Sequence, residues 1–341
     1  MVHHSNKLFT LAATLTLIIL LNGCDKNDVP APQETPDRNR IGYILEDNFN
    51  YSYCQALLNY TGQTAVLRKA DPATFLAPDN AAFLRLQLNF FPNNLYSNNW
   101  YYNIAQYATI PGSHAFRKMP LGDNQPLSSF NGNRMYVSRY LLNGDTITRV
   151  NGVKVATADI KASNGLLQAV EEIVQPETVK NLEQFFLSDT SFTLFSLALQ
   201  HSGLMPMLRT GEYTLLAPGN SVMRTQGNIL PGVNLSTPED ILAIDPTTLA
   251  GIIKYHILPG RSFLDRIQRS AAASGDNSIQ TLNGEKILVG GNSETYNTTT
   301  FKGRNNAGNA GIFRSGNSRQ NFADIPAGNG VVHGINQVLI P

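Results

Sequence analysis

The chain carries two copies of one sequence pattern, and this repetition restricts the possible fold more than any other feature. Residues 156–176 align without a gap with residues 321–341, and seven of the aligned positions are identical. Upstream, four shorter segments recur in the same order: 56–62 with 197–203, 74–80 with 214–220, 107–112 with 255–260, and 131–137 with 283–289. Identity at this length and in this order predicts a tandem of two homologous domains.

The repeat sets the expected domain boundaries. The first domain covers residues 41–176 and the second covers 177–341, and a chain of 341 residues agrees with two domains of ordinary size. The second copy is longer because of an insertion rich in Asn, Gly and Ser around residues 290–316. We expect this insertion to form long loops or an extra hairpin. Few residues follow Pro176 before the next helical stretch, so we expect a defined interface between the domains.

Within each copy, helical signals come first and strand signals follow. Residues 74–77 are a short apolar run that Pro78 ends, which predicts a strand, and the polar residues after it are suited to cap a helix. The Asn-Gly pairs at 164–165 and 329–330 predict tight hairpins between two strands. This order of elements predicts two α+β domains rather than alternating strand–helix–strand units.

The first residues have the pattern of a targeting segment. Residues 8–21 are an uncharged run of fourteen residues, shorter than the roughly 20 apolar residues of a membrane span, so we predict a signal peptide over 1–23. Cys24 completes the sequence Leu-Asn-Gly-Cys, which resembles the lipobox of bacterial lipoproteins and implies a lipid on this cysteine. The alternative is a plain secretory signal in which the cysteine is incidental. Residues 24–40 contain three prolines and are expected to form a disordered tether.

The composition excludes several classes of protein. Lys and Arg total 26 against 25 Asp and Glu, and this balance argues against a nucleic-acid partner. Hydrophobic residues make up 42% of the chain, so we expect a buried core rather than disorder throughout. Charged residues make up only 15%, which predicts a polar but weakly charged surface. Two cysteines exclude a disulfide scaffold, and Cys54, opposite Phe195 of the second copy, is interpreted as a small core hydrophobe.

Three of the recurring segments resemble the signatures of the fasciclin (FAS1) domain. They are TFLAPDNAAF at 74–83, YHILPG at 255–260 and NGVVHGINQVLIP at 329–341. The resemblance implies α+β domains, each a twisted β-sheet wedge or sandwich with helices packed on it. It also implies an extracellular adhesion or recognition role, a protein or glycan ligand, and neither enzymatic activity nor a cofactor. Bacterial members of the family are typically secreted or lipid-anchored.

The two copies depart from these signatures in different places. In the first copy, Ala108 and Gln168 replace two histidines of the family pattern. The second copy keeps both, as His256 and His333, but places Gly219 after the proline of the first signature. The first domain therefore lacks the histidines through which a ligand contact of this kind would be made.

Tyr255, His256 and His333 are the first candidates for a ligand site. Two interpretations stay open: the histidines satisfy buried backbone groups, or Tyr255 and His256 take part in recognition, as the resemblance suggests. No catalytic residue is predicted, because the four histidines of the mature chain are scattered and no G-x-S-x-G motif occurs. No spacing of the C-x-x-C or H-E-x-x-H type occurs either, so no metal site is predicted.

A second candidate lies in the aromatic stretch at residues 89–107, which contains Trp100 and Tyr101 among several asparagines. Aromatic faces beside amide side chains suit sugar or protein surfaces. The alternative is that most of these rings pack on the core of their own domain. An exposed, coplanar pair of Trp100 and Tyr101 would favour a glycan ligand.

Together these features predict a non-enzymatic, lipid-anchored adhesion or recognition protein of a bacterial cell envelope of the Bacteroidota type, in the outer membrane or at the cell surface. Its expected partners are the membrane, through the lipid on Cys24, and an extracellular protein or glycan. The alternative is a glycan-binding accessory lipoprotein that captures polysaccharide. An envelope hydrolase is the third possibility, and the sequence supports it least.

Overall fold

The computed structural model describes residues 35–88, 96–291, 298–313 and 322–341, and residues 38–341 form one compact unit. The predicted signal peptide at 1–23, Cys24 and most of the tether at 24–40 lie outside the described residues. Parts of the aromatic stretch and of the insertion in the second copy lie outside them as well. In the described part of the chain, no helix has both the length and the apolar character that a membrane span requires.

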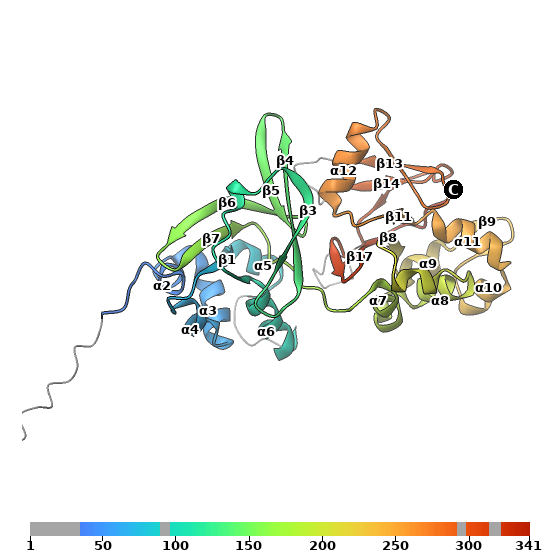
Figure 1. Cartoon of the computed structure of the whole chain (residues 1–341). Coiled ribbons are helices and arrows are strands. Elements are labelled where there is room, and N and C mark those ends of the chain that lie inside the picture. The colour runs from blue at the N-terminus through green and yellow to red at the C-terminus, as the bar shows by residue number, and fades with distance from the viewer. Residues whose placement is uncertain (1–34, 89–95, 292–297, 314–321) are drawn as a thin grey trace, which may run out of the picture. The chain divides into compact units, whose positions relative to one another are not determined.

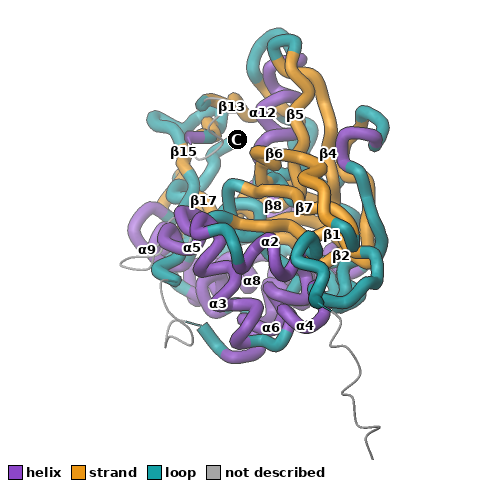
Figure 2. Tube along the Cα trace, turned by 90° about the vertical axis from the view of Figure 1, so that its left-hand side faces the viewer, coloured by secondary structure: helices purple, strands orange, loops and turns teal. Residues whose placement is uncertain are grey.

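The first domain combines short helices with one mixed sheet (Figure 1). Its helices are α2 (Ile41–Glu46), α3 (Ser52–Tyr60), α4 (Gln63–Leu67), α5 (Asn80–Arg85) and α6 (Asn98–Tyr107). Its strands are β1 (Ala73–Pro78), β2 (Thr109–Pro111), β3 (Gly122–Ser128), β4 (Arg134–Leu142), β5 (Asp145–Val150), β6 (Val153–Ala162) and β7 (Gly165–Val170). The sheet order is β2-β1-β7-β6-β5-β4-β3, and only β1 and β7 pair in parallel. In Figure 2 the helices gather below β1 and β7.

The second domain repeats this plan with additional strands. Its helices are α7 (Leu182–Ser188), α8 (Thr193–His201), α9 (Asn220–Gln226), α10 (Pro238–Ala243), α11 (Pro246–Lys254) and α12 (Leu264–Ala273). Its strands are β8 (Tyr213–Pro218), β9 (Asn228–Leu230), β10 (Val233–Asn234), β11 (Ile257–Pro259), β12 (Ser278–Gln280), β13 (Lys286–Gly290), β14 (Thr300–Lys302), β15 (Ala310–Gly311), β16 (Ile325–Ala327) and β17 (Gly330–Ile335). They form sheets of order β11-β8-β17-β16 and β12-β13-β14-β15, and β9 pairs with β10.

The two domains share the same central strand pairing. In the first, β1 runs parallel to β7 with Ala73 opposite Gly165, and in the second β8 runs parallel to β17 with Tyr213 opposite Gly330. On its other side each central strand pairs antiparallel with a short strand, β2 or β11. The predicted tandem of two α+β domains is therefore confirmed.

A repeated asparagine ties the hairpin of each domain to the start of that domain. The Asn164 side chain accepts a hydrogen bond from Ile41 N (2.9 Å) and donates to the carbonyl oxygens of Leu67 and Lys69 (2.9 and 2.8 Å). Asn329 does the same in the second domain, accepting from Leu182 N (2.8 Å) and donating to Leu208 O and Gly211 O (2.9 and 2.7 Å). The hairpins predicted at these positions are present, and the asparagine also joins three separate segments in each of them.

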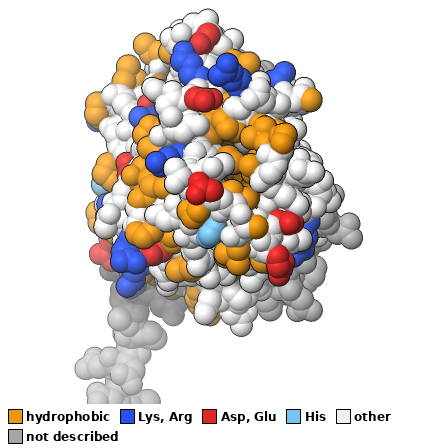
Figure 3. Space-filling view, turned by 90° about the vertical axis from the view of Figure 1, so that its right-hand side faces the viewer, with side chains coloured by type: hydrophobic (Ala, Val, Ile, Leu, Met, Phe, Trp, Pro, Cys, Tyr) orange, Lys and Arg blue, Asp and Glu red, His pale blue; other side chains and the backbone are white. Residues whose placement is uncertain are grey.

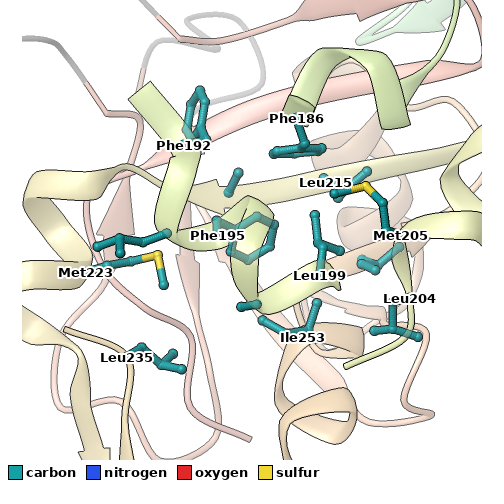
Figure 4. Close-up of a cluster of buried hydrophobic side chains, with 14 of the residues drawn as sticks. Phe186, Phe192, Phe195, Leu199, Leu204, Met205, Leu215, Met223, Leu235 and Ile253 are labelled. Carbon is teal, nitrogen blue, oxygen red and sulfur yellow. The ribbon is translucent and has the colours of Figure 1, made fainter. Parts of the chain in front are cut away.

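Each domain buries apolar side chains between its helices and its central strands. In the second domain a cluster centred on Phe186, Phe192 and Phe195 packs against Leu215 of β8 and Met223 of α9 (Figure 4). The equivalent cluster of the first domain contains Cys54, Phe75 and Phe83, together with residues of α6. Both clusters are continuous enough to explain why short helices of five to ten residues are stable here.

Side chains of the two domains also contact one another within the compact unit of residues 38–341. Tyr136 of β4 clusters with Phe263 and Val331, and the Arg261 guanidinium lies 4.0 Å from the centre of the Tyr136 ring. Asn124 Nδ2 donates a hydrogen bond to Arg261 O (2.8 Å). These contacts agree with the interface expected from the short connection.

Candidate functional site

His256 lies directly before β11, and its side chain is fully buried. Its Nε2 accepts a hydrogen bond from Leu339 N (2.9 Å), so its proton is on Nδ1, which donates to Ile252 O (3.0 Å). Burial lowers the pKa of His256 to about 4, and the ring is therefore neutral at neutral pH. The imidazole joins the end of α11 to the C-terminal segment.

The neighbouring Tyr255 is buried in a similar way. Its hydroxyl donates to Lys286 O (2.9 Å) and accepts from Arg304 N (2.9 Å). Burial raises the pKa of this phenol, which therefore stays protonated near neutral pH. Tyr255 thus holds the β12–β15 sheet to the segment that precedes β11.

His333 lies on β17, and its side chain is also fully buried. Its Nδ1 accepts from Asp324 N (3.0 Å), so Nε2 carries the proton and donates to Ser262 O (2.9 Å). Burial lowers the pKa of His333 to about 4. The backbones of the two histidines adjoin Leu216 of β8, where His333 is its partner on β17 and His256 O accepts from Leu216 N (2.8 Å).

Both imidazoles therefore use both ring nitrogens on the backbone of their own domain. A general base or a ligand contact requires a ring nitrogen that can reach a reacting or bound atom. Neither ring has such a nitrogen in this structure, and Tyr255 has no exposed side-chain surface. Of the two interpretations left open by the sequence, the geometry favours the structural one.

In the first domain, different residues stand at the positions of the two histidines, and one of them makes comparable hydrogen bonds. Gln168 replaces His333: its Oε1 accepts from Asp159 N (2.9 Å), as the imidazole accepts from Asp324 N, and its Nε2 donates to His114 O (3.3 Å). Ala108, which replaces His256, has no side chain to make a comparable bond. Ala108 and Cys54 instead line a small apolar cavity of about 10 Å³, and Cys54 is fully buried, which raises the pKa of its thiol.

The aromatic stretch does not present Trp100 and Tyr101 as a coplanar pair. Tyr101 is fully buried, and its ring is inclined by 81° to the Trp100 ring at a centroid distance of 5.5 Å. Consecutive residues of a helix point in directions about 100° apart, so the exposed, coplanar pair that would favour a glycan ligand is not formed, and Tyr101 packs on the core as the alternative interpretation expects. Trp100 stacks instead on Tyr96, with centroids 4.1 Å apart and an interplanar angle of 21°, and both rings are half-buried.

The second domain contains a groove that the sequence reasoning missed. Its volume is about 560 Å³, and it is bounded by the end of α9, the start of β9, the connection between β14 and β15 and the segment after β17. The lining residues are Gln226, Asn228, Ile229, Asn306, Asn309, Asn336, Gln337, Val338 and Ile340. We call this feature the amide groove, since six of these nine residues carry primary amides and none is charged. Among the described residues, no group of three or more His, Cys, Asp or Glu side chains is placed to hold a metal ion.

The comparisons with known proteins agree with this architecture. The protein-family model of the Fasciclin domain matches residues 49–176 and 190–341. The chain therefore belongs to the fasciclin domain family, with two tandem copies of the domain. Fasciclin domains are found in cell adhesion proteins, and the comparisons indicate no enzyme family.

Among curated proteins, the chain is similar to human periostin, with 29% identity over 148 residues, which are 43% of this chain and 15% of periostin. It is also similar to the transforming growth factor-beta-induced protein ig-h3 of pig (Sus scrofa), with 27% identity over 165 residues, 48% of this chain and 23% of that protein. The chain thus matches less than a quarter of the length of these relatives. The chain is also similar to a solved structure of a FAS1 domain pair from the insect cell adhesion molecule Fasciclin I. The match covers 85% of this chain and 96% of that one, with 15% identity and a TM-score of 0.39.

Proposed function

We propose that this protein is a lipid-anchored, non-enzymatic adhesion or recognition protein of a bacterial cell surface, with a protein or glycan ligand. The observation that carries this proposal is the match of both domains to the Fasciclin domain family, and the hydrogen bonds of His256 and His333 to the backbone remove these rings as ligand contacts. Because both ring nitrogens of each histidine bond the backbone, we place the ligand contact on the surface side chains. The face seen in Figure 3 is largely uncharged, with small groups of Lys, Arg, Asp and Glu side chains among hydrophobic and other uncharged ones, which agrees with the low charge of the sequence.

The anchor in this proposal is a lipid on Cys24, and the membrane is an outer membrane of the Bacteroidota type. The short apolar run at residues 8–21 followed by Leu-Asn-Gly-Cys supports it. Metabolic labelling of cells with an alkyne fatty acid tests it directly. The label is expected on the wild-type protein and on Cys54→Ser, whose cysteine is buried, and it is expected to disappear in Cys24→Ser. Equal labelling of the Cys24→Ser variant would exclude this anchor.

The ligand is tested with the chain from residue 25 onward, which keeps the whole compact unit. This protein is applied to an array of glycans and to an array of extracellular-matrix proteins. Binding to either array supports a recognition function. Binding to neither, together with a failure of protein-coated beads to adhere to one another, would contradict it.

The alternative proposal, an accessory lipoprotein that captures polysaccharide, is favoured by two observations. The first is the stacked pair of Tyr96 and Trp100 on the first domain, because an aromatic surface can stack on sugar rings. The second is the amide groove of the second domain. Hits confined to the glycan array would favour this alternative over adhesion to proteins.

A further inference from the structure

We infer that the amide groove of the second domain binds a neutral polysaccharide chain. This inference rests on the proposed recognition function and names both its ligand class and its site. The volume of about 560 Å³ lies within the range of about 300–1,000 Å³ that is usual for ligand sites. The groove is formed by segments of one domain only, so its geometry does not depend on the neighbouring domain.

The chemistry of the lining matches hydroxyl groups. A primary amide offers two donors and an acceptor oxygen, and a sugar hydroxyl both donates and accepts, so one amide can bond two neighbouring hydroxyls. Since no lining residue is charged, an anionic or cationic ligand would find no partner for its charge. Ile229, Val338 and Ile340 add apolar surface, which suits the C–H faces of sugar rings.

Two of the amides hold the walls of the groove in place. Asn306, which is 95% buried, donates through Nδ2 to Val338 O (2.8 Å) and accepts through Oδ1 from Ile340 N (2.8 Å). Asn336 accepts through Oδ1 from Gly311 N (2.7 Å), and its own backbone N donates to Gly311 O (2.9 Å). The insertion and the C-terminal segment are thereby joined, and a joined wall binds without first having to be ordered.

The remaining amides are available to a ligand. In the described part of the chain, the side chains of Asn228, Asn309 and Gln337 make no hydrogen bond, and Gln226 makes only a long one, from Nε2 to Asn336 O (3.4 Å). Asn228 and Asn309 are exposed, and Gln337 is half-buried. The groove thus combines a fixed frame with unpaired donors and acceptors along its surface, which is what recognition of a polyhydroxylated chain requires.

A protein ligand fits this groove less well. Protein interfaces draw most of their binding energy from aromatic or Arg anchors seated in apolar pockets, and from charged partners. The lining of the amide groove offers neither an aromatic side chain nor a charge. The chemistry therefore favours a neutral glycan.

The groove is also specific to the second domain. The positions that align with Asn336 and Gln337 are Glu171 and Glu172 in the first domain, and Glu171 forms an ion pair with Lys154 (3.3 Å). Asn306 and Asn309 belong to the insertion, which the first domain lacks. The insertion therefore supplies one wall of the site, and the first domain has charged residues where the opposite wall would be.

The test is affinity electrophoresis of the chain from residue 25 onward in gels that contain dextran, laminarin, glucomannan or xylan, with polygalacturonate as the anionic comparison. The variant Asn228→Ala/Asn309→Ala/Gln337→Ala removes three unpaired amides. The matched control is Asn103→Ala, an exposed amide of the first domain on α6. An unchanged thermal midpoint of each variant shows that it folds.

We expect retardation by at least one neutral polysaccharide and none by polygalacturonate. The triple variant should bind about tenfold more weakly or worse, because it loses three amides that bond the ligand, and the control should bind normally. Wild-type binding by the folded triple variant would overturn the inference, as would the absence of neutral-glycan binding.

The variant Trp100→Ala separates this inference from the broader proposal. If glycan binding is lost in Trp100→Ala but kept in the triple variant, the amide groove is excluded while glycan recognition stands. If no glycan binds and a matrix protein does, the groove is again excluded while the adhesion function survives. Failure of both arrays would overturn the inference about the groove, and failure of the bead adhesion assay as well would overturn both proposals.

Discussion

The two domains of this protein share a backbone frame, which is the central parallel strand pair with its hairpin, and differ in the side chains that pack around it. In both, a parallel pair of strands lies at the centre, and an Asn side chain bonds two upstream segments to the hairpin of that domain. Where the second domain packs Phe195 against His256, with ring centroids 5.8 Å apart, the first has Cys54 and Ala108 and a small cavity. The comparison teaches that the asparagine is part of the frame, whereas the histidines are one of several ways to complete it.

The largest expected effect comes from giving the second domain the residues of the first. The double variant Phe195→Cys/His256→Ala removes two large side chains and leaves Leu339 N without its acceptor. We expect the free energy of unfolding of the second domain to fall by about 5 kcal/mol. Hydrogen exchange measured by mass spectrometry, resolved by domain, reports this loss. A change below about 1 kcal/mol would show that the second domain can repack around the smaller residues of the first domain with little loss of stability.

The next effect should be equal in the two domains, because it concerns the shared frame. A Cβ at Gly165 would lie 1.8 Å from Ala73 O, and one at Gly330 would lie 2.1 Å from Tyr213 O. Gly165→Ala and Gly330→Ala are each expected to cost more than about 3 kcal/mol, and each to accelerate exchange only in its own domain. The control Gly251→Ala, on a helix with open space around it, should be neutral or slightly stabilising. Unequal losses would mean that the two frames are less alike than their strand register indicates.

Acid should separate the two domains. His256 and His333 have folded-state pKa values of about 4 against 6.5 in the unfolded chain, so the unfolded state binds more protons between these values. Each histidine therefore contributes about 3 kcal/mol at pH 7 that is lost as the pH falls from about 6.5 to 4. Burial raises the pKa of Asp324, which works in the opposite direction and reduces the net loss.

The measurement is urea unfolding at pH 7 and at pH 4.5. Trp100, the one tryptophan of the chain, reports the first domain by fluorescence, and hydrogen exchange reports the second. The second domain should lose more stability than the first, and His333→Gln, which copies Gln168, should reduce this loss. An identical pH response in the variant and the wild type would exclude a titrating His333.

The smallest expected effect concerns the helix after the central strand. Asp79 caps α5 by accepting a hydrogen bond from Ala82 N (2.9 Å), whereas Gly219 at the same place before α9 has no capping side chain. Gly219→Asp should stabilise the second domain by about 0.5 kcal/mol, and Asp79→Gly should destabilise the first by a similar amount. Thermal unfolding of both variants checks this. A loss on Gly219→Asp would point to crowding by Phe313, whose ring would lie 3.2 Å from the new Cβ.

Much of the fold could be predicted because it is encoded in local signals that occur twice. The repeat gave the tandem, and the Asn-Gly pairs predicted the hairpins. A structural role of the histidines could also be inferred from the sequence. Their bonding partners could not, because they depend on long-range packing, as the hydrogen bond from Leu339 N to His256 illustrates.

The candidate sites were harder to predict, for two physical reasons. Trp100 and Tyr101 are neighbours in the sequence, but the helix turns their side chains to different sides, and only the fold decides which side is buried. The amide groove is lined from segments near residues 226–229, 306–309 and 336–340, which only the tertiary structure brings together. The one sequence signal for it was the insertion rich in Asn and Gly.

The substitution of Cys54 for an aromatic ring has a practical consequence. Its thiol is shielded by the core, and burial raises its pKa, so alkylating reagents should reach it only when the first domain opens. If Cys24 is blocked by lipid, as proposed, Cys54 carries the sole free thiol of the mature protein. The rate at which Cys54 is alkylated on living cells therefore measures how often the first domain opens while the protein is bound to its ligand.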